Sequence, residues 1–188
     1  AKLYRTVSLF SGAMGLDIGL ENTGRFETIG AVEVNQAFSE SMRANKEAGN
    51  LANKAIQIFQ EDLHTFEPEE LMKQLGIVPG EIDLLTGGPP CQSFSTAGRR
   101  GTTQDVRGTL IWRFLHFVKV MKPKYFLMEN VRGLMSAALR HRPISERPNK
   151  GGPPLEADEE PGSVIQRFVE DLDEEYRMDC FEVNAVNY

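Results

Sequence analysis

The chain has 188 residues, 40% of them hydrophobic and 26% charged, which is typical of one globular domain with a sizeable core. Its formal net charge of -6 is unusual for a protein that binds nucleic acid. The sequence has no long apolar run and no secretory signal, which predicts an intracellular protein, cytoplasmic if bacterial, with no membrane partner. The two cysteines, Cys91 and Cys180, form no C-x-x-C pair and the three histidines are scattered, which argues against a disulfide framework and against a metal site.

The first half of the chain alternates predicted strands with predicted helices. Residues 6–10 have the apolar, β-branched character of a strand, residues 11–15 predict a tight turn, and residues 16–22 fit a helix that stops before Gly24. A strand, a helix, a weak strand and a short helix follow at residues 26–34, 36–46, 55–59 and 68–75.

The turn Ser11-Gly12-Ala13-Met14-Gly15 is a candidate binding element. Glu33 stands at the end of the next strand, eighteen residues after Gly15. A glycine turn that leads into a helix, followed by an acid at a strand end, can hold a nucleotide-like ligand whose ribose hydroxyls donate to the carboxylate. Met14 stands where a further glycine completes the usual pattern, so plain turn chemistry stays an alternative at this point.

The segment Gly87-Gly88-Pro89-Pro90-Cys91-Gln92-Ser93-Phe94-Ser95 contains the candidate nucleophile. It follows a short apolar strand at residues 82–86, and the loops at the carboxyl ends of such strands build sites in α/β sheets. Lone cysteines are more often small buried hydrophobes, but this loop has no apolar periodicity that buries one. Two prolines stiffen the approach to Cys91, which favours a positioned thiolate.

After a loop at residues 93–108, the second half predicts a helix at 109–121 and a buried strand at 125–128. Residues 143–162 hold five of the ten prolines and predict a loop or disordered tether. A helix and a last strand follow at residues 163–175 and 178–186. The alternation of strands and helices predicts an α/β fold with a mostly parallel sheet flanked by helices.

The basic residues of the chain are segregated. Residues 97–150 contain twelve Lys or Arg and three acids, a net charge of +9, whereas the rest of the chain carries -15. This block could contact nucleic-acid phosphates, although charge runs are more often solvated faces.

Glu129 and Asn130 directly follow the strand at residues 125–128. Beside a buried strand, the Glu129 carboxyl is expected to be partly desolvated, with a raised pKa and the ability to donate to a ring nitrogen. The alternative is that one of the two residues caps the next helix.

Three motifs in this order, the turn at residues 11–15, the loop around Cys91 and Glu129-Asn130-Val131, resemble the DNA (cytosine-5)-methyltransferase family. The resemblance covers essentially the whole chain and implies a Rossmann-like, S-adenosylmethionine-dependent methyltransferase fold, incomplete in this chain. Residues 1–188 are then part of one catalytic, cofactor-binding domain, with the segment 143–162 as a loop within it. Double-stranded DNA is the implied partner, and restriction protection is one candidate role.

The resemblance also implies a mechanism. Cys91 adds to carbon 6 of a flipped cytosine, carbon 5 takes the methyl group of S-adenosylmethionine, and Glu129 donates to ring nitrogen 3. Residues near the flipped nucleotide or its backbone are Gln92, Ser95, Arg107 and Asn130. The residues implied to bind the cofactor are Phe10, Gly12, Ala13, Gly15, Glu33, Val34, Asp62, Leu63, Pro90 and Leu110.

Family members continue past the final strand into a glutamine and arginine motif and a target-recognition domain, which this sequence lacks. We therefore expect a missing carboxyl-terminal portion or a complementary subunit to be needed, and little activity from this chain alone. Alternatives are a tRNA cytosine-5 methyltransferase and a non-catalytic binding or regulatory module of the same fold. A nicotinamide-dependent oxidoreductase explains only the glycine turn and Glu33.

Overall fold

The computed structural model describes residues 2–90, 109–184 and 186. These residues form two compact units. The first, here called the sheet unit, comprises residues 2–90 and 109–130, and the second, the carboxyl-terminal unit, comprises the described residues from 131 onward. The expectation of a single domain over the whole chain stays a prediction.

Within the described residues, the sheet unit is built on a parallel sheet of strand order β3-β2-β1-β4-β5. The strands are β1 (Tyr4–Leu9), β2 (Phe26–Val32), β3 (Gln57–Phe59), β4 (Leu84–Gly87) and β5 (Tyr125–Met128). β1 lies in the centre, between β2 and β4, so the chain moves outward on one side of β1 and then returns to build the other side. This reversal creates a crevice at the carboxyl ends of β1 and β4, the usual ligand position in such sheets.

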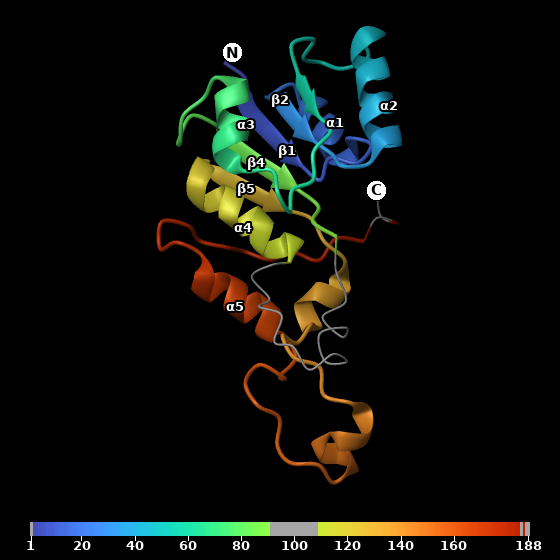
Figure 1. Cartoon of the computed structure of the whole chain (residues 1–188), viewed down its shortest axis with the longest axis vertical. Coiled ribbons are helices and arrows are strands. Elements are labelled where there is room, and N and C mark those ends of the chain that lie inside the picture. The colour runs from blue at the N-terminus through green and yellow to red at the C-terminus, as the bar shows by residue number, and fades with distance from the viewer. Residues whose placement is uncertain (1, 91–108, 185, 187–188) are drawn as a thin grey trace. The chain divides into compact units, whose positions relative to one another are not determined.

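Four helices of the described chain cover this sheet. They are α1 (Gly15–Glu21), α2 (Gln36–Glu47), α3 (Pro68–Leu75) and α4 (Leu110–Met121). Figure 1 shows α1 and α2 on one side of the sheet and α3 with α4 on the other. The connections between parallel strands are right-handed, so the side on which a helix lies depends on the direction in which the next strand is added. This direction reverses after β3, which puts α3 and α4 on the opposite side of the sheet from α1 and α2.

One part of the core lies where α4 packs on β4 and β5. α4 is apolar around most of its surface, and Phe114 and Phe117 are fully buried. A Cβ atom at Gly87 would lie 2.9 Å from the Leu9 carbonyl oxygen and 2.9 Å from the Phe114 ring. Glycine at the end of β4 therefore allows the helix and two strands to approach closely.

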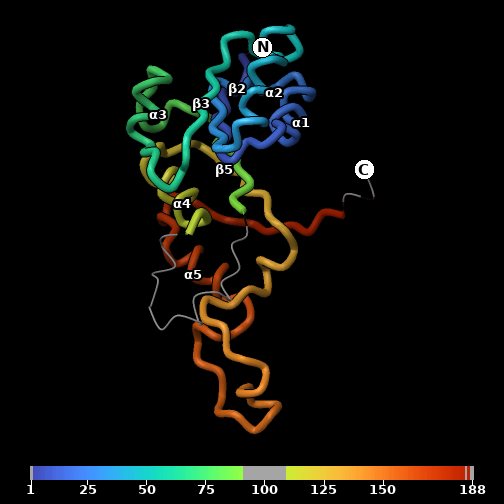
Figure 2. The backbone as a smooth tube through the Cα atoms, turned by 45° about the vertical axis from the view of Figure 1, so that its right-hand side comes forward, coloured from blue at the N-terminus to red at the C-terminus, as the bar shows by residue number. Residues whose placement is uncertain are grey.

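The carboxyl-terminal unit contains three short 3-10 helices and one α-helix among its described residues. They are η3 (Arg132–Ser136), η4 (Ile144–Glu146), η5 (Pro148–Lys150) and α5 (Ser163–Asp171). In Figure 2 the orange segment before α5 leaves and returns as two adjacent runs, which the hydrogen bond from the Arg140 N–H to the Asp158 carbonyl joins at 2.8 Å. The proline-rich segment 143–162 thus contains η4 and η5 within an irregular loop.

Most of the predicted elements are present, and apart from the end of α5 their boundaries differ from the prediction by at most two residues. The predicted strand at residues 178–186 is wrong, because none of the described residues in that range is in a strand and Phe181 is 84% exposed. α5 ends at Asp171, four residues before the predicted end. β5 was expected to be buried but alternates exposed and half-buried residues, because it is the edge strand of the described sheet.

Candidate active site

The turn between β1 and α1 has an unusual backbone. Phe10 and Met14 have φ values of 54° and 62°, and Gly12 between them has 53°. Left-handed φ costs a non-glycine residue about 1–3 kcal/mol and persists only where surrounding contacts enforce it. Met14 is 1% exposed and packs in a cluster with Met42 and other apolar side chains, so core packing holds the turn in shape.

Glu33 connects this turn to the end of β2. Its Oε2 atom accepts from the Gly12 N–H at 2.8 Å, and its Oε1 atom accepts from the Asn35 N–H at 2.8 Å. The residue is only 9% exposed. Each carboxylate oxygen can accept a second hydrogen bond, so Glu33 keeps acceptor capacity for ligand hydroxyls.

A cavity of about 240 Å³, here called the cofactor cavity, lies beside Glu33. Seven of the ten residues predicted to bind a cofactor line it: Phe10, Glu33, Val34, Asp62, Leu63, Pro90 and Leu110. The other lining residues, Val32, Glu61 and Gly88, were not predicted. Apolar walls around one buried carboxylate suit a flat heterocycle joined to a diol, which is the chemistry of an adenine nucleoside.

The three remaining predicted residues, Gly12, Ala13 and Gly15, do not line this cavity. Gly12 contributes through its N–H bond to Glu33, whereas Ala13 and Gly15 are exposed in the turn. Their part in binding stays a prediction.

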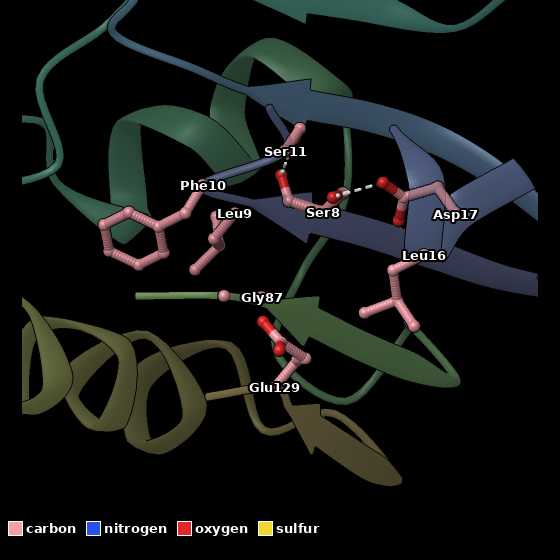
Figure 3. A pocket seen from close by; sticks show the side chains of 9 residues that line it. Ser8, Leu9, Phe10, Ser11, Leu16, Asp17, Gly87 and Glu129 are labelled. Carbon is pink, nitrogen blue, oxygen red and sulfur yellow. Dashed lines mark hydrogen bonds between the residues drawn. The ribbon is translucent and has the colours of Figure 1, made fainter. Parts of the chain in front are cut away.

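A second cavity of about 290 Å³, here called the strand-end cavity, shares Phe10 and Gly88 with the first. Figure 3 shows its walls at the ends of β1, β4 and β5 and at the start of α1. Its lining residues are Ser8, Leu9, Phe10, Ser11, Leu16, Asp17, Gly87, Gly88 and Glu129. The shared residues make the two cavities neighbours, as a two-substrate site requires.

Glu129 follows β5 and lines the strand-end cavity. Its backbone N–H donates to the Gly87 carbonyl at 2.9 Å, and a Cβ at Gly88 would lie 3.2 Å from its Oε2 atom. The glycine thus leaves room for this carboxylate. The predicted desolvation of Glu129 is wrong, since the residue is exposed beside an edge strand.

Asp17, which lines the strand-end cavity, is a buried acid that the sequence motifs did not predict. It is 1% exposed, and its carboxylate accepts from the Ser8 hydroxyl at 2.8 Å and from the Thr86 hydroxyl at 3.0 Å. Burial raises the pKa of Asp17 above its ordinary value, although the two hydroxyl donors oppose this. An acid between Leu16 and Ile18 was the only sequence signal for it.

Asp62 lines the cofactor cavity from the turn after β3. Its carboxylate accepts from the His64 N–H at 2.9 Å and lies 3.0 Å from the His64 ring nitrogen Nδ1. These contacts lower the pKa of Asp62, so its side chain is held as an anion at the cavity edge.

Asn130 bonds to the protein itself, through an Nδ2–H that donates to the Pro89 carbonyl at 2.8 Å. Pro89 stands two residues before Cys91. The predicted nucleophile Cys91 and the predicted substrate contacts Gln92, Ser95 and Arg107 lie outside the described residues.

In the described part of the chain, no cluster of three or more His, Cys, Asp or Glu side chains could hold a metal ion. None of the helices in that part is long and apolar enough to cross a membrane.

Comparison with known proteins places this geometry in a family. The family model described as C-5 cytosine-specific DNA methylase matches residues 4–143. Type II methyltransferase M.Sau96I of Staphylococcus aureus is 38% identical over 135 residues, which is 72% of this chain and 29% of that protein. Type II methyltransferase M.AquIA of a Picosynechococcus strain is 39% identical over 132 residues, which is 70% of this chain and 50% of that protein.

The chain therefore belongs to the C-5 cytosine-specific DNA methylase family. Its fold is also that of a crystal structure of Spodoptera frugiperda DNMT2, with a TM-score of 0.50 at 21% identity over 69% of this chain and 36% of the other. This confirms the predicted Rossmann-like methyltransferase fold. The matched chain spans between 29% and 50% of the length of the two bacterial relatives.

Proposed function

We propose that this chain supplies the cofactor-binding part and the nucleophile of an enzyme that transfers a methyl group from S-adenosylmethionine to carbon 5 of cytosine in double-stranded DNA. The observation that supports it most is the cofactor cavity, which gathers seven of the predicted residues from the segments that follow β1, β2, β3 and β4 and from the start of α4. The family of the chain agrees with the use of this cavity for S-adenosylmethionine, and so does the order of these residues along the sequence.

The residues of the cofactor cavity fit an adenine nucleoside. Glu33 accepts hydrogen bonds from the ribose hydroxyls, Val34 and Leu63 cover the adenine ring, and Asp62 accepts from its edge. When bound, S-adenosylmethionine supplies the methyl group. Phe10 and Gly88 line both cavities, so a ligand on these residues extends toward the strand-end cavity.

The reaction at the cytosine ring depends on Cys91 and Glu129. The Cys91 thiolate forms a bond to carbon 6, and the displaced π electrons move to carbon 5, which forms a bond to the methyl group as that group's bond to sulfur breaks. The Glu129 carboxyl, in its protonated form, donates to ring nitrogen 3 and so stabilises the charge that thiolate addition produces. A base then removes the proton on carbon 5, and the carbon 6–sulfur bond breaks to release Cys91.

Covalent trapping tests the nucleophile. The complete gene product is incubated with S-adenosylmethionine and duplex DNA that contains 5-fluorocytosine, whose fluorine blocks the final elimination. We expect a denaturation-resistant adduct with wild type and none with Cys91→Ala. Cys180→Ala is the matched control, since Cys180 is the other cysteine and is exposed. Equal adducts with both variants would contradict the assignment of Cys91.

The same assay separates the alternatives. If a tRNA substrate traps the enzyme and duplex DNA does not, the substrate is RNA and not DNA. Isothermal titration with S-adenosylmethionine tests the cofactor directly. An absence of binding at millimolar concentration would count against the cofactor cavity and favour a non-catalytic module of this fold.

A further inference from the structure

Arg113 on α4 lies behind the wall of the cofactor cavity and does not line it. Its Nε–H donates to the Leu63 carbonyl at 2.7 Å, and an Nη2–H donates to the Phe66 carbonyl at 2.9 Å. The same Nη2 atom lies 3.3 Å from the Glu67 carboxylate. The side chain is 16% exposed, so these bonds are partly shielded from water.

These bonds join two segments that both contribute residues to the lining of the cofactor cavity. Leu63 lines the cavity from the turn between β3 and α3, and Leu110 lines it from the first turn of α4, three residues before Arg113. The turn is also held by the bonds from the Thr65 and Phe66 N–H groups to the Asp62 carbonyl, by the His64 contacts to the Asp62 carboxylate and by the burial of the Leu63 and Phe66 side chains. The Arg113 guanidinium is the group that ties the turn carrying Leu63 to the helix carrying Leu110.

A guanidinium suits this task because it is planar, permanently charged and presents several N–H groups in a fixed fork. It reaches two carbonyl oxygens and a carboxylate at once, which the single ammonium of a lysine cannot reproduce. The guanidinium carbon also lies 5.8 Å from the centre of the Phe117 ring, which further restricts its orientation.

We infer that Arg113 is a positioning residue for the cofactor, holding Asp62 and Leu63 at the spacing from Leu110 that an adenine ring needs. This inference rests on the proposed use of the cofactor cavity. Arg113 does not line the cofactor cavity and lies fifty residues from Leu63 along the chain. It affects the affinity for the cofactor through its hydrogen bond to the Leu63 backbone.

The test compares Arg113→Lys with wild type by isothermal titration of S-adenosylhomocysteine and of adenosine, at a temperature well below both melting points. We expect both ligands to bind about tenfold more weakly to the variant, which corresponds to the loss of roughly one charge-assisted hydrogen bond. Hydrogen exchange of the Thr65 and Phe66 amides should speed up in the variant without ligand, because the turn loses its hydrogen bonds to α4.

Two controls separate positioning from general stability. Arg43→Lys changes an arginine of the same unit whose described side-chain contact is a 3.5 Å bond to Gln60, and it should leave both affinities unchanged. Arg113→Gln keeps an amide donor of similar reach, and it replaces Arg113→Lys in the titrations if the lysine variant does not fold. Unchanged affinities in a folded Arg113 variant, with only a lower melting point, would overturn the inference. Wild type that binds neither ligand would overturn the cofactor cavity itself, and the inference with it.

Discussion

At the end of β2, one carboxylate serves both the protein and the proposed ligand. Glu33 holds the glycine turn through Gly12 and its own strand end through Asn35, while it lines the cofactor cavity. Glutamine at this position keeps only one carbonyl oxygen and places an amide donor against a backbone N–H.

For Glu33→Gln we therefore expect a loss of stability of about 1 kcal/mol or more, measured by denaturant unfolding, because a part-buried N–H group loses its acceptor. The affinity for S-adenosylmethionine should fall at least about tenfold, measured by titration calorimetry. Glu40→Gln, which alters an exposed α2 carboxylate bonded to Gln36, is the control and should change neither quantity. Unaltered affinity in a folded Glu33→Gln protein would refute the role of Glu33.

Asp17 gives the chain a distinctive dependence on pH. Burial raises its pKa in the folded state, so the folded protein binds more protons than the unfolded chain at pH values between the two pKa values. The contribution of Asp17 to stability is then largest below its unfolded pKa, near 3.8, and decreases as the pH rises through the folded pKa.

Asp17→Asn removes this titration and keeps one acceptor and two donors for the Ser8 and Thr86 hydroxyls. We expect the variant to gain stability relative to wild type as the pH rises from about 4 to 7, measured by urea unfolding at several pH values. A constant stability difference between the two proteins over this range would show that Asp17 does not titrate as its burial predicts.

At the scale of elements, the loop before α5 is organised by ion pairs. Arg140 binds Asp158 with an Nε–Oδ2 distance of 2.9 Å, and Arg142 binds Glu159 with an Nε–Oε1 distance of 3.0 Å. The Arg142 and Glu159 side chains are 11% and 4% exposed. The Arg142 guanidinium keeps the pKa of Glu159 below its usual range, so the pair stabilises the loop at neutral pH and loses this effect as the pH falls through the folded pKa.

We predict that Glu159→Gln speeds hydrogen exchange of the Arg140 amide, which bonds to the Asp158 carbonyl, at pH 7. The difference from wild type should shrink at acidic pH, where wild type also loses the charge. Nuclear magnetic resonance measures the exchange rates of the two proteins at neutral and at acidic pH, and each rate is corrected for intrinsic exchange. Glu170→Gln, on an exposed pair with Arg167 of α5, should leave the loop unchanged. A difference that does not depend on pH would assign the stabilisation to packing.

At the scale of the whole molecule, every described residue that lines the cofactor cavity belongs to the sheet unit. S-adenosylmethionine at a hundred times its dissociation constant should stabilise that unit by about 2.7 kcal/mol. We expect slower hydrogen exchange at Gly12, Glu33 and Leu63, and no change over α5, measured by mass spectrometry or magnetic resonance. Equal protection of both units would mean that the ligand does not bind specifically at the cofactor cavity.

The sequence by itself determined the alternation of elements and most walls of the cofactor cavity. Strand ends, glycine turns and helix starts depend on neighbouring residues, so Glu33, Leu63 and Leu110 could be read from local pattern and family motifs. The failed prediction at residues 178–186 has the opposite origin, because an apolar segment forms a strand only where another strand offers hydrogen bonds.

Only the tertiary structure decided the contacts that join distant segments. Asp17 meets Thr86 across 69 residues of sequence, and Arg113 meets Leu63 across 50. Neither contact leaves a local pattern, because each depends on which helix packs on which strand. The exposure of Glu129 was likewise decided by the position of β5 at the edge of the described sheet, where one side of the strand lacks a neighbour.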